Sequence, residues 1–591
     1  MKRHAAPVLA LIAISFALYA NAFRNEFAWD DDIFIVNAKE IRSVNLPRFF
    51  SEGSADLYRP LRTALYALTY RFGGLDPLNY HIVGKTMNAL TVAILYGLLL
   101  LLFENRGGAF WGALLFAVHP VHTEKVAFIT STYDIPADLL WLAAFALYVL
   151  HRKRRPPFAL TVSVLLFAAG LLFGENAAVL PLTVVLYDMT FGDGDKKPAR
   201  WIPYFAVLAV YLAVRTSVLG AVAREGGHTL NPDMFGNFLT MSGVTFAYFK
   251  LLLWPWPLIP TYEVKQAVFP YPPHLYAAAI AVAALLAAAW LQRRGRPWVT
   301  FTVFWFFAVI SPNLNFIPTG NLMAERYLYL PSAILSFSVA AAYAALEADR
   351  KKKAALLAAL LAVMAVFSVL VVRRNPDWRS DTPLWSKTLM VKPDSYVALM
   401  NLAVEAWKNG HWKTTEKLLK YAAAVKPEKT EAFERLTEMY LEGKAGDPLP
   451  MLEKAYSKDK KDVCLLGIAQ IKISRKEYAA AGAMVDGLLK RNPSSRKAWS
   501  VYGDLLYSQK KEGWAGAYVR AYALSGRDPA ILVRMATAWS LAGKPAAALR
   551  IARIGLQEHP DNKPLLELAA KLEAENPGEM GDNGGTRSGN K

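Results

Sequence analysis

Three consecutive carboxylates, Asp30, Asp31 and Asp32, follow an apolar stretch near the N-terminus. Adjacent like charges repel one another, so their position beside a predicted membrane surface needs a reason. They could bind a metal ion, act as a general base toward an acceptor hydroxyl, or lie in water as a solvated loop. Spacing alone leaves these alternatives open.

Other ionisable side chains interrupt the apolar sequence farther along. Arg59 carries a planar donor fork that suits a phosphate, although an ordinary lipid-headgroup contact is an alternative. Charges within apolar stretches usually have a partner or a polar cavity. The further examples are Glu175, Arg215 and the adjacent pair Glu325 and Arg326. For that pair, a local ion pair without functional meaning is the alternative.

His119, His122 and Glu124 place two imidazoles and a carboxylate within one short break at the edge of a predicted span. Zinc is one alternative for this cluster, but the spacing of the three residues is unusual for zinc. Hydrogen bonding or substrate contact is the favoured interpretation. The metal-ligating residues are therefore unknown, and a divalent cation is the one cofactor left open.

The composition requires more than one physical environment. The 591 residues are 54% hydrophobic with a mean hydropathy of +0.21, which is too apolar for a soluble chain of this length. The net charge of +19 comes with short Lys and Arg clusters beside apolar runs. This pattern indicates membrane topology and no nucleic-acid partner. The single cysteine, Cys464, excludes an intramolecular disulfide framework.

Apolar stretches predict about eleven membrane spans. They lie near residues 5–23, 83–103, 109–126, 136–150, 158–173, 176–190, 201–219, 273–291, 298–311, 331–346 and 354–372. Residues 238–253 are interpreted as interfacial or re-entrant. The first stretch also resembles a cleavable signal peptide, and either reading leaves residue 24 onward outside the cytoplasm.

An odd number of spans and a cytoplasmic N-terminus place four basic clusters on the cytoplasmic side, as the positive-inside rule requires. These clusters are residues 151–155, 196–200, 292–297 and 347–353. The acidic residues near 30 and everything after Arg373 then lie outside the cytoplasm. Short loops and the lack of an endoplasmic-reticulum retention signal favour the cytoplasmic (inner) membrane of a bacterium.

The last third of the chain carries a repeat. Pro393 and Pro427 lie 34 residues apart in similar Val-Lys-Pro contexts, and Pro493, Pro529 and Pro560 continue the series. That period predicts tetratricopeptide-like helical hairpins stacked as an α-solenoid. We therefore expect a membrane domain over residues 1–374, a repeat domain over 375–575 and a disordered tail over 576–591.

Taken in order, the motifs resemble those of the transmembrane and tetratricopeptide-repeat O-mannosyltransferases, a TMTC-like family of the C-type (GT-C) glycosyltransferases. They are residues 27–31, 58–61, 80–81, 119–127, 324–332 and 374–378. The resemblance implies an all-α fold in which a polytopic GT-C helix bundle precedes the repeat solenoid.

The resemblance also implies an inverting transfer of a hexosyl or mannosyl group from a polyprenyl-phosphate donor to hydroxyl groups of a protein acceptor. Asp30 and Asp31 match the catalytic acidic motif of the family. The residues that would line the donor site are Arg59, His119, His122, Glu124, Arg215, Glu325 and Arg326. The repeats would engage the acceptor.

The chain departs from the family pattern at three positions. The family often has Lys at the position of Gly174, Arg near the position of Thr132 and Asn at the position of Gly84. These departures concern the donor headgroup and the sugar and leave the acidic motif unchanged. Two other functions remain open: a non-enzymatic membrane-anchored scaffold, and a GT-C transferase that acts on lipid or polysaccharide. An anchor, however, needs one span and no buried charges.

Overall fold

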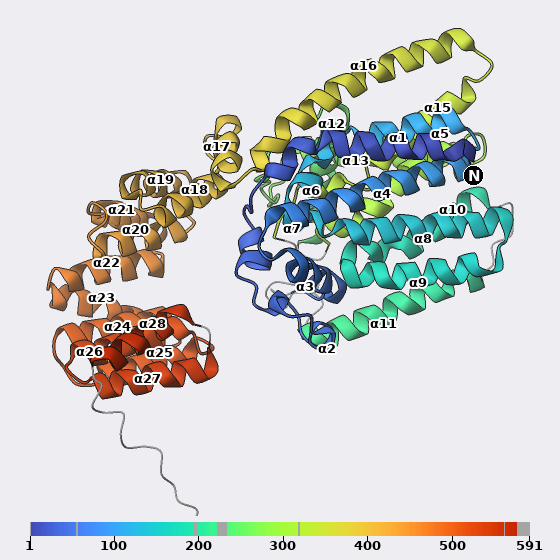
Figure 1. Ribbon diagram of the computed structural model, residues 1–591. Helices are drawn as coiled ribbons and strands as arrows, with labels where there is room; N and C mark the ends of the chain where they lie inside the picture. The colour runs from blue at the N-terminus through green and yellow to red at the C-terminus, as the bar shows by residue number, and fades with distance from the viewer. Residues whose placement is uncertain are drawn as a thin grey trace, which may run out of the picture. The chain divides into compact units, whose positions relative to one another are not determined.

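The computed structural model describes residues 2–54, 57–192, 198–220, 233–316, 320–560 and 562–575. Over these ranges the chain is largely helical and contains no β-sheet, which confirms the predicted all-α class. Two compact units, Met1–Pro393 and Asp394–Lys591, make up the chain (Figure 1). The tail 576–591, for which we predicted disorder, lies outside the described residues.

The first unit is a bundle of long apolar helices, several of which run side by side in Figure 1. Its helices are α1 (Lys2–Leu18), α2 (Leu46–Ser51), α3 (Pro60–Gly73), α4 (Pro77–Phe103), α5 (Arg106–Ala117), α6 (Thr123–Ala127), α7 (Ile129–Thr132), α8 (Ile135–Arg154), α9 (Pro157–Phe173), α10 (Leu180–Phe191), α11 (Ile202–Leu219), α12 (Met234–Leu253), α13 (Pro273–Leu291), α14 (Pro297–Ile310), α15 (Ala333–Ala345), α16 (Arg350–Arg374) and α17 (Asp381–Val391).

Six helical stretches of the described chain are long and apolar enough to cross a membrane. They are Pro77–Phe103, Ile129–Arg154, Ile202–Leu219, Pro273–Leu291, Glu325–Ala345 and Arg350–Trp378. The five other predicted spans are also helical but shorter, at 12 to 17 residues, in α1, α5, α9, α10 and α14. Prolines and glycines such as Pro120, Gly174 and Pro312 follow closely on several of these helices and interrupt the helical path.

Two of the basic clusters, residues 151–155 and 347–353, lie at the same end of this bundle. Lys153 Nζ lies 2.9 Å from Glu104 Oε1, just past the end of α4, and Asn105 donates to Glu347 at 3.2 Å. At the start of α4, His81 Nε2 lies 3.0 Å from the carbonyl of Asn25, close to the acidic residues. The 27 residues of α4 extend about 40 Å. The acidic motif and these two basic clusters therefore occupy opposite ends of the bundle.

Two glycines one helical turn apart let α5 approach α15 closely. A Cβ at Gly108 would lie 2.8 Å from the carbonyl oxygen of Ala340, and one at Gly112 would lie 2.6 Å from that of Ser336. Small residues at this spacing bring apolar helices into backbone contact, which favours helix packing within a membrane. The pair explains how a helix of only 12 residues is held in the bundle.

Replacing Gly112 by Ala is expected to destabilise the first unit by about 1–3 kcal/mol, because the added methyl group meets a backbone carbonyl that cannot rotate away. The measurement is the thermal midpoint of the full-length protein in detergent. Gly97→Ala is the matched control, since a Cβ at Gly97 of α4 has nothing within 4 Å. Equal midpoints for the two variants would contradict this packing argument.

The second unit consists of successive helical hairpins. Its helices are α18 (Tyr396–Lys408), α19 (Trp412–Val425), α20 (Glu431–Leu441), α21 (Leu449–Asp459), α22 (Asp462–Ser474), α23 (Tyr478–Arg491), α24 (Arg496–Ser508), α25 (Trp514–Leu524), α26 (Pro529–Leu541), α27 (Pro545–Glu558) and α28 (Lys563–Glu575). Small residues such as Ala403, Ala481 and Ala552 are buried between them. The helices form the predicted α-solenoid.

The turn inside each hairpin repeats along the solenoid. A residue with positive φ follows the first helix of successive hairpins, at Gly410, Gly443, Lys476, Lys510 and Gly543. These positions are 33 or 34 residues apart. The left-handed residue ends one helix so that the next can return antiparallel to it. The structural period therefore agrees with the period of the prolines.

Candidate active site

A cavity of about 480 Å³ opens at the end of the first unit that holds the acidic motif. Among its described lining residues, five side chains are cationic and three are acidic. They are Arg59, Arg62, Lys125, Arg215, Arg326, Asp30, Asp134 and Glu175. Aromatic and apolar side chains, including Phe34 and Tyr211, complete the wall. The excess of cations suits an anionic ligand that also has an apolar part.

Asp30 and Asp31 have different surroundings. Asp30 lines the cavity, whereas Asp31 is 1% exposed and is absent from the cavity wall. Asp31 accepts hydrogen bonds from the backbone N–H of Thr130 (2.8 Å), the hydroxyl of Thr130 (2.5 Å) and the backbone N–H of Ala28 (3.0 Å). Burial raises the pKa of Asp31 to about 7. Asp31 thus braces the turn that presents Asp30.

Arg59 joins two carboxylates at the cavity wall. Its guanidinium donates to both oxygens of Glu175, at 2.7 and 2.8 Å, and to Asp134 at 2.7 Å. Arg62 donates to the same oxygen of Asp134 at 3.0 Å. Pro60 begins α3 directly after Arg59, so the end of a helix fixes the position of this arginine. The cluster brings together α3, the turn before α8 and the turn after α9.

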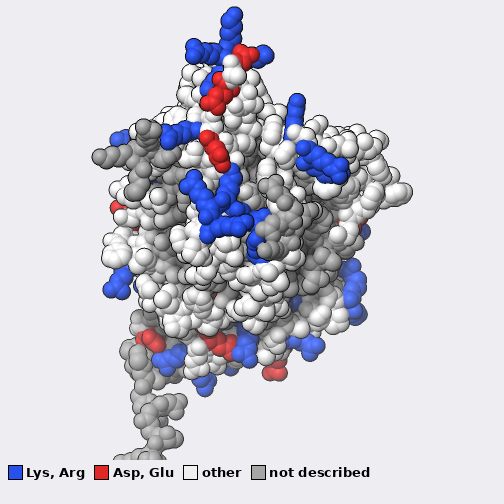
Figure 2. Space-filling view, turned by 90° about the vertical axis from the view of Figure 1, so that its right-hand side faces the viewer, with Lys and Arg blue, Asp and Glu red and all other residues white. Residues whose placement is uncertain are grey.

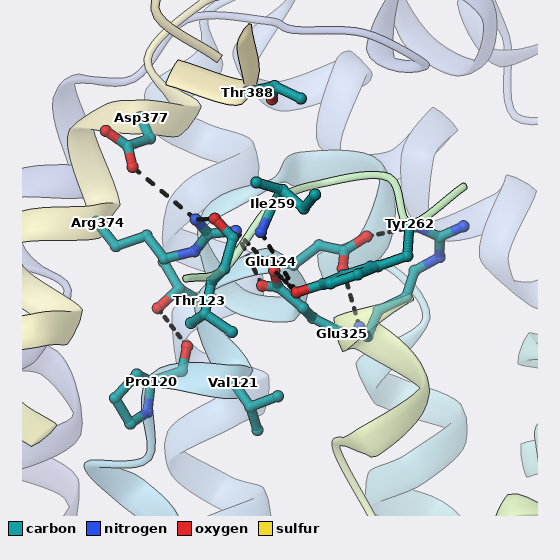
Figure 3. A network of polar contacts seen from close by, with 12 residues as sticks. Pro120, Val121, Thr123, Glu124, Ile259, Tyr262, Glu325, Arg374, Asp377 and Thr388 are labelled. Atoms are coloured by element: carbon teal, nitrogen blue, oxygen red, sulfur yellow. Dashed lines mark hydrogen bonds and ion pairs between the residues drawn. The ribbon is translucent and has the colours of Figure 1, made fainter. Parts of the chain in front are cut away.

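Arg326 lines the cavity and joins a second polar network, of which Glu124, Tyr262, Glu325 and Arg374 are labelled in Figure 3. Its guanidinium pairs with Glu124, and its backbone N–H donates to the same carboxylate at 3.0 Å. The neighbouring Glu325 is fully buried, pairs with Arg374 at 2.9 Å and accepts the hydroxyl of Tyr262 at 3.0 Å. Glu124 and Glu325 therefore lie outside the cavity wall, and Glu124 acts on it through Arg326.

The two histidines that we placed in the donor site are not among the residues lining the cavity. His119 Nε2 lies 2.9 Å from the carbonyl of Leu252, and His122 Nε2 lies 2.8 Å from the hydroxyl of Ser332. Glu124 pairs with Arg326. The three side chains thus have separate partners. Over the described residues, no three His, Cys, Asp or Glu side chains form a group that could hold a metal ion.

Arg215 also reaches the cavity, from near the C-terminal end of α11. Its buried Nε has no hydrogen-bond partner among the described residues. The other cations of the wall pair with carboxylates: Arg59 and Arg62 with Asp134, and Lys125 with Asp138 at 3.2 Å. Arg215 thus adds a fifth positive charge to the cavity wall.

Sequence reasoning did not include Arg62, Lys125, Asp134 or Thr130 in the site. Lys125, Asp134 and Asp138 are ionisable residues in the otherwise apolar sequence 109–150. The rule that drew attention to Glu175 and Arg215 applies equally to them. For Thr130 no signal exists, because a threonine at a helix edge is common and its contact with Asp31 crosses 99 residues.

Two of the positions that depart from the family pattern contact each other. A Cβ at Gly84 of α4 would lie 1.7 Å from Cγ2 of Thr132, which leaves no room for any larger side chain. The hydroxyl of Thr132 donates to the carbonyl of Phe128 at 2.8 Å. Gly84 and Thr132 therefore pack against each other, so the two departures from the family pattern depend on one another. They lie close to Thr130, which donates hydrogen bonds to Asp31.

Comparisons with known proteins agree with these motifs. Residues 60–220 match the model of the dolichyl-phosphate-mannose-protein mannosyltransferase family. The Caenorhabditis elegans protein O-mannosyl-transferase F38B6.6 is 26% identical over 69% of this chain and 61% of its own length. Mouse protein O-mannosyl-transferase TMTC1 is 33% identical over 30% of this chain and 21% of its own length.

One solved structure is also similar, ArnT from Cupriavidus metallidurans bound to undecaprenyl phosphate. It is 13% identical, with a TM-score of 0.34, and the match covers 71% of this chain and 74% of ArnT.

The helix bundle and its charged cavity define a multi-pass membrane protein with an appended helical-repeat unit. Within that class, the chain is similar to the TMTC protein O-mannosyl-transferases, which confirms the resemblance drawn from its motifs. The chain spans about 61% of the length of the curated relatives that it matches over most of its sequence.

Proposed function

We propose that this protein is an inverting GT-C glycosyltransferase. It takes a hexosyl or mannosyl group from a polyprenyl-phosphate donor and transfers it to hydroxyl groups of protein acceptors on the non-cytoplasmic face of a membrane. The observation that carries this proposal is the cavity, in which Asp30 faces the same space as Arg59, Arg215 and Arg326. A carboxylate that can act as general base, together with several cations, suits transfer from a phosphate leaving group.

The reaction follows from these charges. The acceptor oxygen attacks the anomeric carbon and its proton passes to the carboxylate of Asp30, which acts as general base. The bond between the anomeric carbon and the phosphate oxygen breaks, and its electron pair stays on the phosphate. Arg215 and Arg326 offset the negative charge that develops on this leaving group. A single displacement of this kind inverts the anomeric configuration.

The distribution of charge supports an outer location for the site. In Figure 2, the end of the bundle that faces the viewer carries many Lys and Arg side chains and few acidic ones. Cationic loops remain on the cytoplasmic side of a membrane. The cavity at the other end of α4 would then face outward, with the N-terminus cytoplasmic and the repeats outside. We propose the inner membrane of a bacterium.

The repeats supply a place for the acceptor polypeptide. A groove of about 530 Å³ in the second unit is lined by acidic side chains of α20 and by basic side chains from α24 and α26. They include Glu434, Glu438, Arg496, Lys497 and Arg534. Extended concave surfaces of stacked hairpins suit an unfolded segment. A segment with charges of both signs fits this lining.

The test is transfer by the full-length protein in lipid vesicles from labelled dolichyl- or undecaprenyl-phosphate mannose to a mixture of extracytoplasmic proteins. Label should appear on protein. Label on glycolipid or polysaccharide alone would instead favour the transferase of lipid or polysaccharide, and no transfer from any lipid-phosphate sugar would favour the scaffold.

In the same assay, Arg215→Ala should raise the KM for the donor about 10- to 100-fold, since a charge-assisted hydrogen bond contributes about 1.5–3 kcal/mol. Its thermal midpoint verifies that the variant is folded. Arg71→Ala removes an equal charge from an exposed site on α3 and is the control. Equal KM values for both variants would argue against a donor phosphate at Arg215.

A further inference from the structure

The chain that follows the last membrane helix runs beside the chain that precedes the acidic turn. Asn21 donates to the carbonyl of Val372 at 2.8 Å, and Asn375 donates to the carbonyl of Leu18 at 2.8 Å. Asn25 donates to the carbonyl of Asn375 at 3.0 Å. Asn25 and Asn375 are themselves buried. These bonds join the end of α1 to the end of α16.

Two more hydrogen bonds extend this pairing to the acidic turn itself. The backbone N–H of Glu26 donates to the carbonyl of Arg379 at 2.8 Å. The backbone N–H of Trp29 donates to Oδ1 of Asp381, the first residue of α17, at 2.7 Å. Asp381 therefore holds the amide of the residue that directly precedes Asp30.

Trp29 is also fixed by its side chain. Its ring packs edge-on against Trp385 at 5.3 Å and stacks on Phe128 at 5.5 Å and on Trp378 at 6.5 Å. Trp378 and Trp385 are almost fully buried. Trp29 has φ of 54°, a left-handed backbone that non-glycine residues rarely adopt. Such a conformation persists only where the surroundings impose it.

A purely local role for Asp381 would be to place a negative charge at the start of α17, which favours the helix dipole. The contact with Trp29 goes beyond that role, because it reaches across 352 residues to a backbone amide. Releasing this amide frees the turn to relax from its left-handed conformation. The carboxylate of Asp30 would then move relative to the cations of the cavity.

We propose that Asp381 is a positioning residue for Asp30 and that the segment 375–391 completes the active site. The proposal rests on the proposed function, in which Asp30 is the general base. It assigns a catalytic purpose to the helix that directly precedes the repeat unit along the chain. Because α17 ends at Val391 and the second unit begins at Asp394, the same segment connects the acidic turn to the repeats.

The test compares Asp381→Ala with Asp381→Asn in the full-length protein. Asp381→Ala removes the acceptor and should lower kcat roughly 10- to 100-fold, as expected for a displacement of about 1 Å, with the donor KM unchanged within a factor of about two. Asp381→Asn keeps an Oδ1 acceptor and should retain most of the activity. Equal kcat values for Asp381→Ala and the unaltered protein would overturn the proposal.

Hydrogen–deuterium exchange of the peptide around residues 24–34 supplies a readout independent of transfer. It should accelerate in Asp381→Ala and not in Asp381→Asn or in Thr382→Ala, an exposed control on the same helix. If Asp381→Ala does not fold, Asp381→Glu keeps the charge, moves the acceptor by one methylene group and carries the same test. Unchanged exchange refutes this proposal alone, whereas full activity of Asp30→Asn would refute the proposed function.

Discussion

Replacing Asp30 by Asn is expected to lower kcat for sugar transfer about 10²- to 10⁴-fold, the range typical for loss of a general base. The amide has almost the same shape as the carboxylate and cannot take the acceptor proton. Asp30 lines the cavity, whereas Asp31 lies behind it, bonded to Thr130 and Ala28. The donor KM should change little, because the cations that would hold the phosphate remain.

The matched control is Asp32→Asn, which removes the same charge two positions along the chain, outside the cavity wall. Both variants are compared in vesicles with labelled polyprenyl-phosphate mannose. Thermal midpoints verify that both variants are folded. An Asp30→Asn protein that transfers sugar as fast as Asp32→Asn would remove Asp30 from the chemistry.

Replacing Arg59 by Ala should abolish transfer and also destabilise the first unit by about 3–5 kcal/mol, the usual cost of removing one partner of a buried ion pair. Arg59 is 15% exposed and pairs with Asp134 and Glu175. Its loss leaves the carboxylates of Asp134 and Glu175 without the guanidinium that donates to both of them. The measurements are the thermal midpoint in detergent and the transfer rate.

Arg48→Ala is the control for this prediction. Arg48 pairs with Glu52 at 2.8 Å, but both side chains are more than half exposed, so the loss should stay below about 1 kcal/mol. The double variant Arg59→Ala with Glu175→Gln should recover part of the stability, because it removes the uncompensated charge. Equal thermal midpoints for Arg48→Ala and Arg59→Ala would show that the ion pairs of Arg59 do not stabilise the first unit.

The helical class and the repeat could be predicted because both depend on local patterns. A run of apolar residues such as 83–103 is helical wherever it lies in a membrane, since its backbone must satisfy its own hydrogen bonds. The interval between Pro393 and Pro427 matches that between Gly410 and Gly443 to within one residue. The lengths of the helices were harder to predict from the sequence, because residues such as Gly174 end helices within stretches that are apolar throughout.

The charged residues of the site could be found in part from the cost of placing charge in apolar sequence. Arg59 was chosen for its donor fork and Arg326 from the resemblance, whereas that cost selected Glu175 and Arg215; all four residues line the cavity. The cost does not say which charges pair with each other, so Glu124 and Glu325 appeared equivalent to them. Their roles differ because each is buried against an arginine of its own.

By itself, the sequence determined that this protein is a helical membrane protein with a repeat domain. It also showed a resemblance to O-mannosyltransferases and supplied a set of charged residues as candidates for the site. Only the tertiary structure decided that Asp30 faces the cavity and Asp31 does not. It also decided that Asp381 of α17 accepts a hydrogen bond from the backbone of Trp29, in the turn that carries Asp30. The physical reason is that hydropathy and repeat period are properties of residues that are close together in the chain, so they can be read from the sequence. A hydrogen bond between residues 352 positions apart depends on how the whole bundle packs.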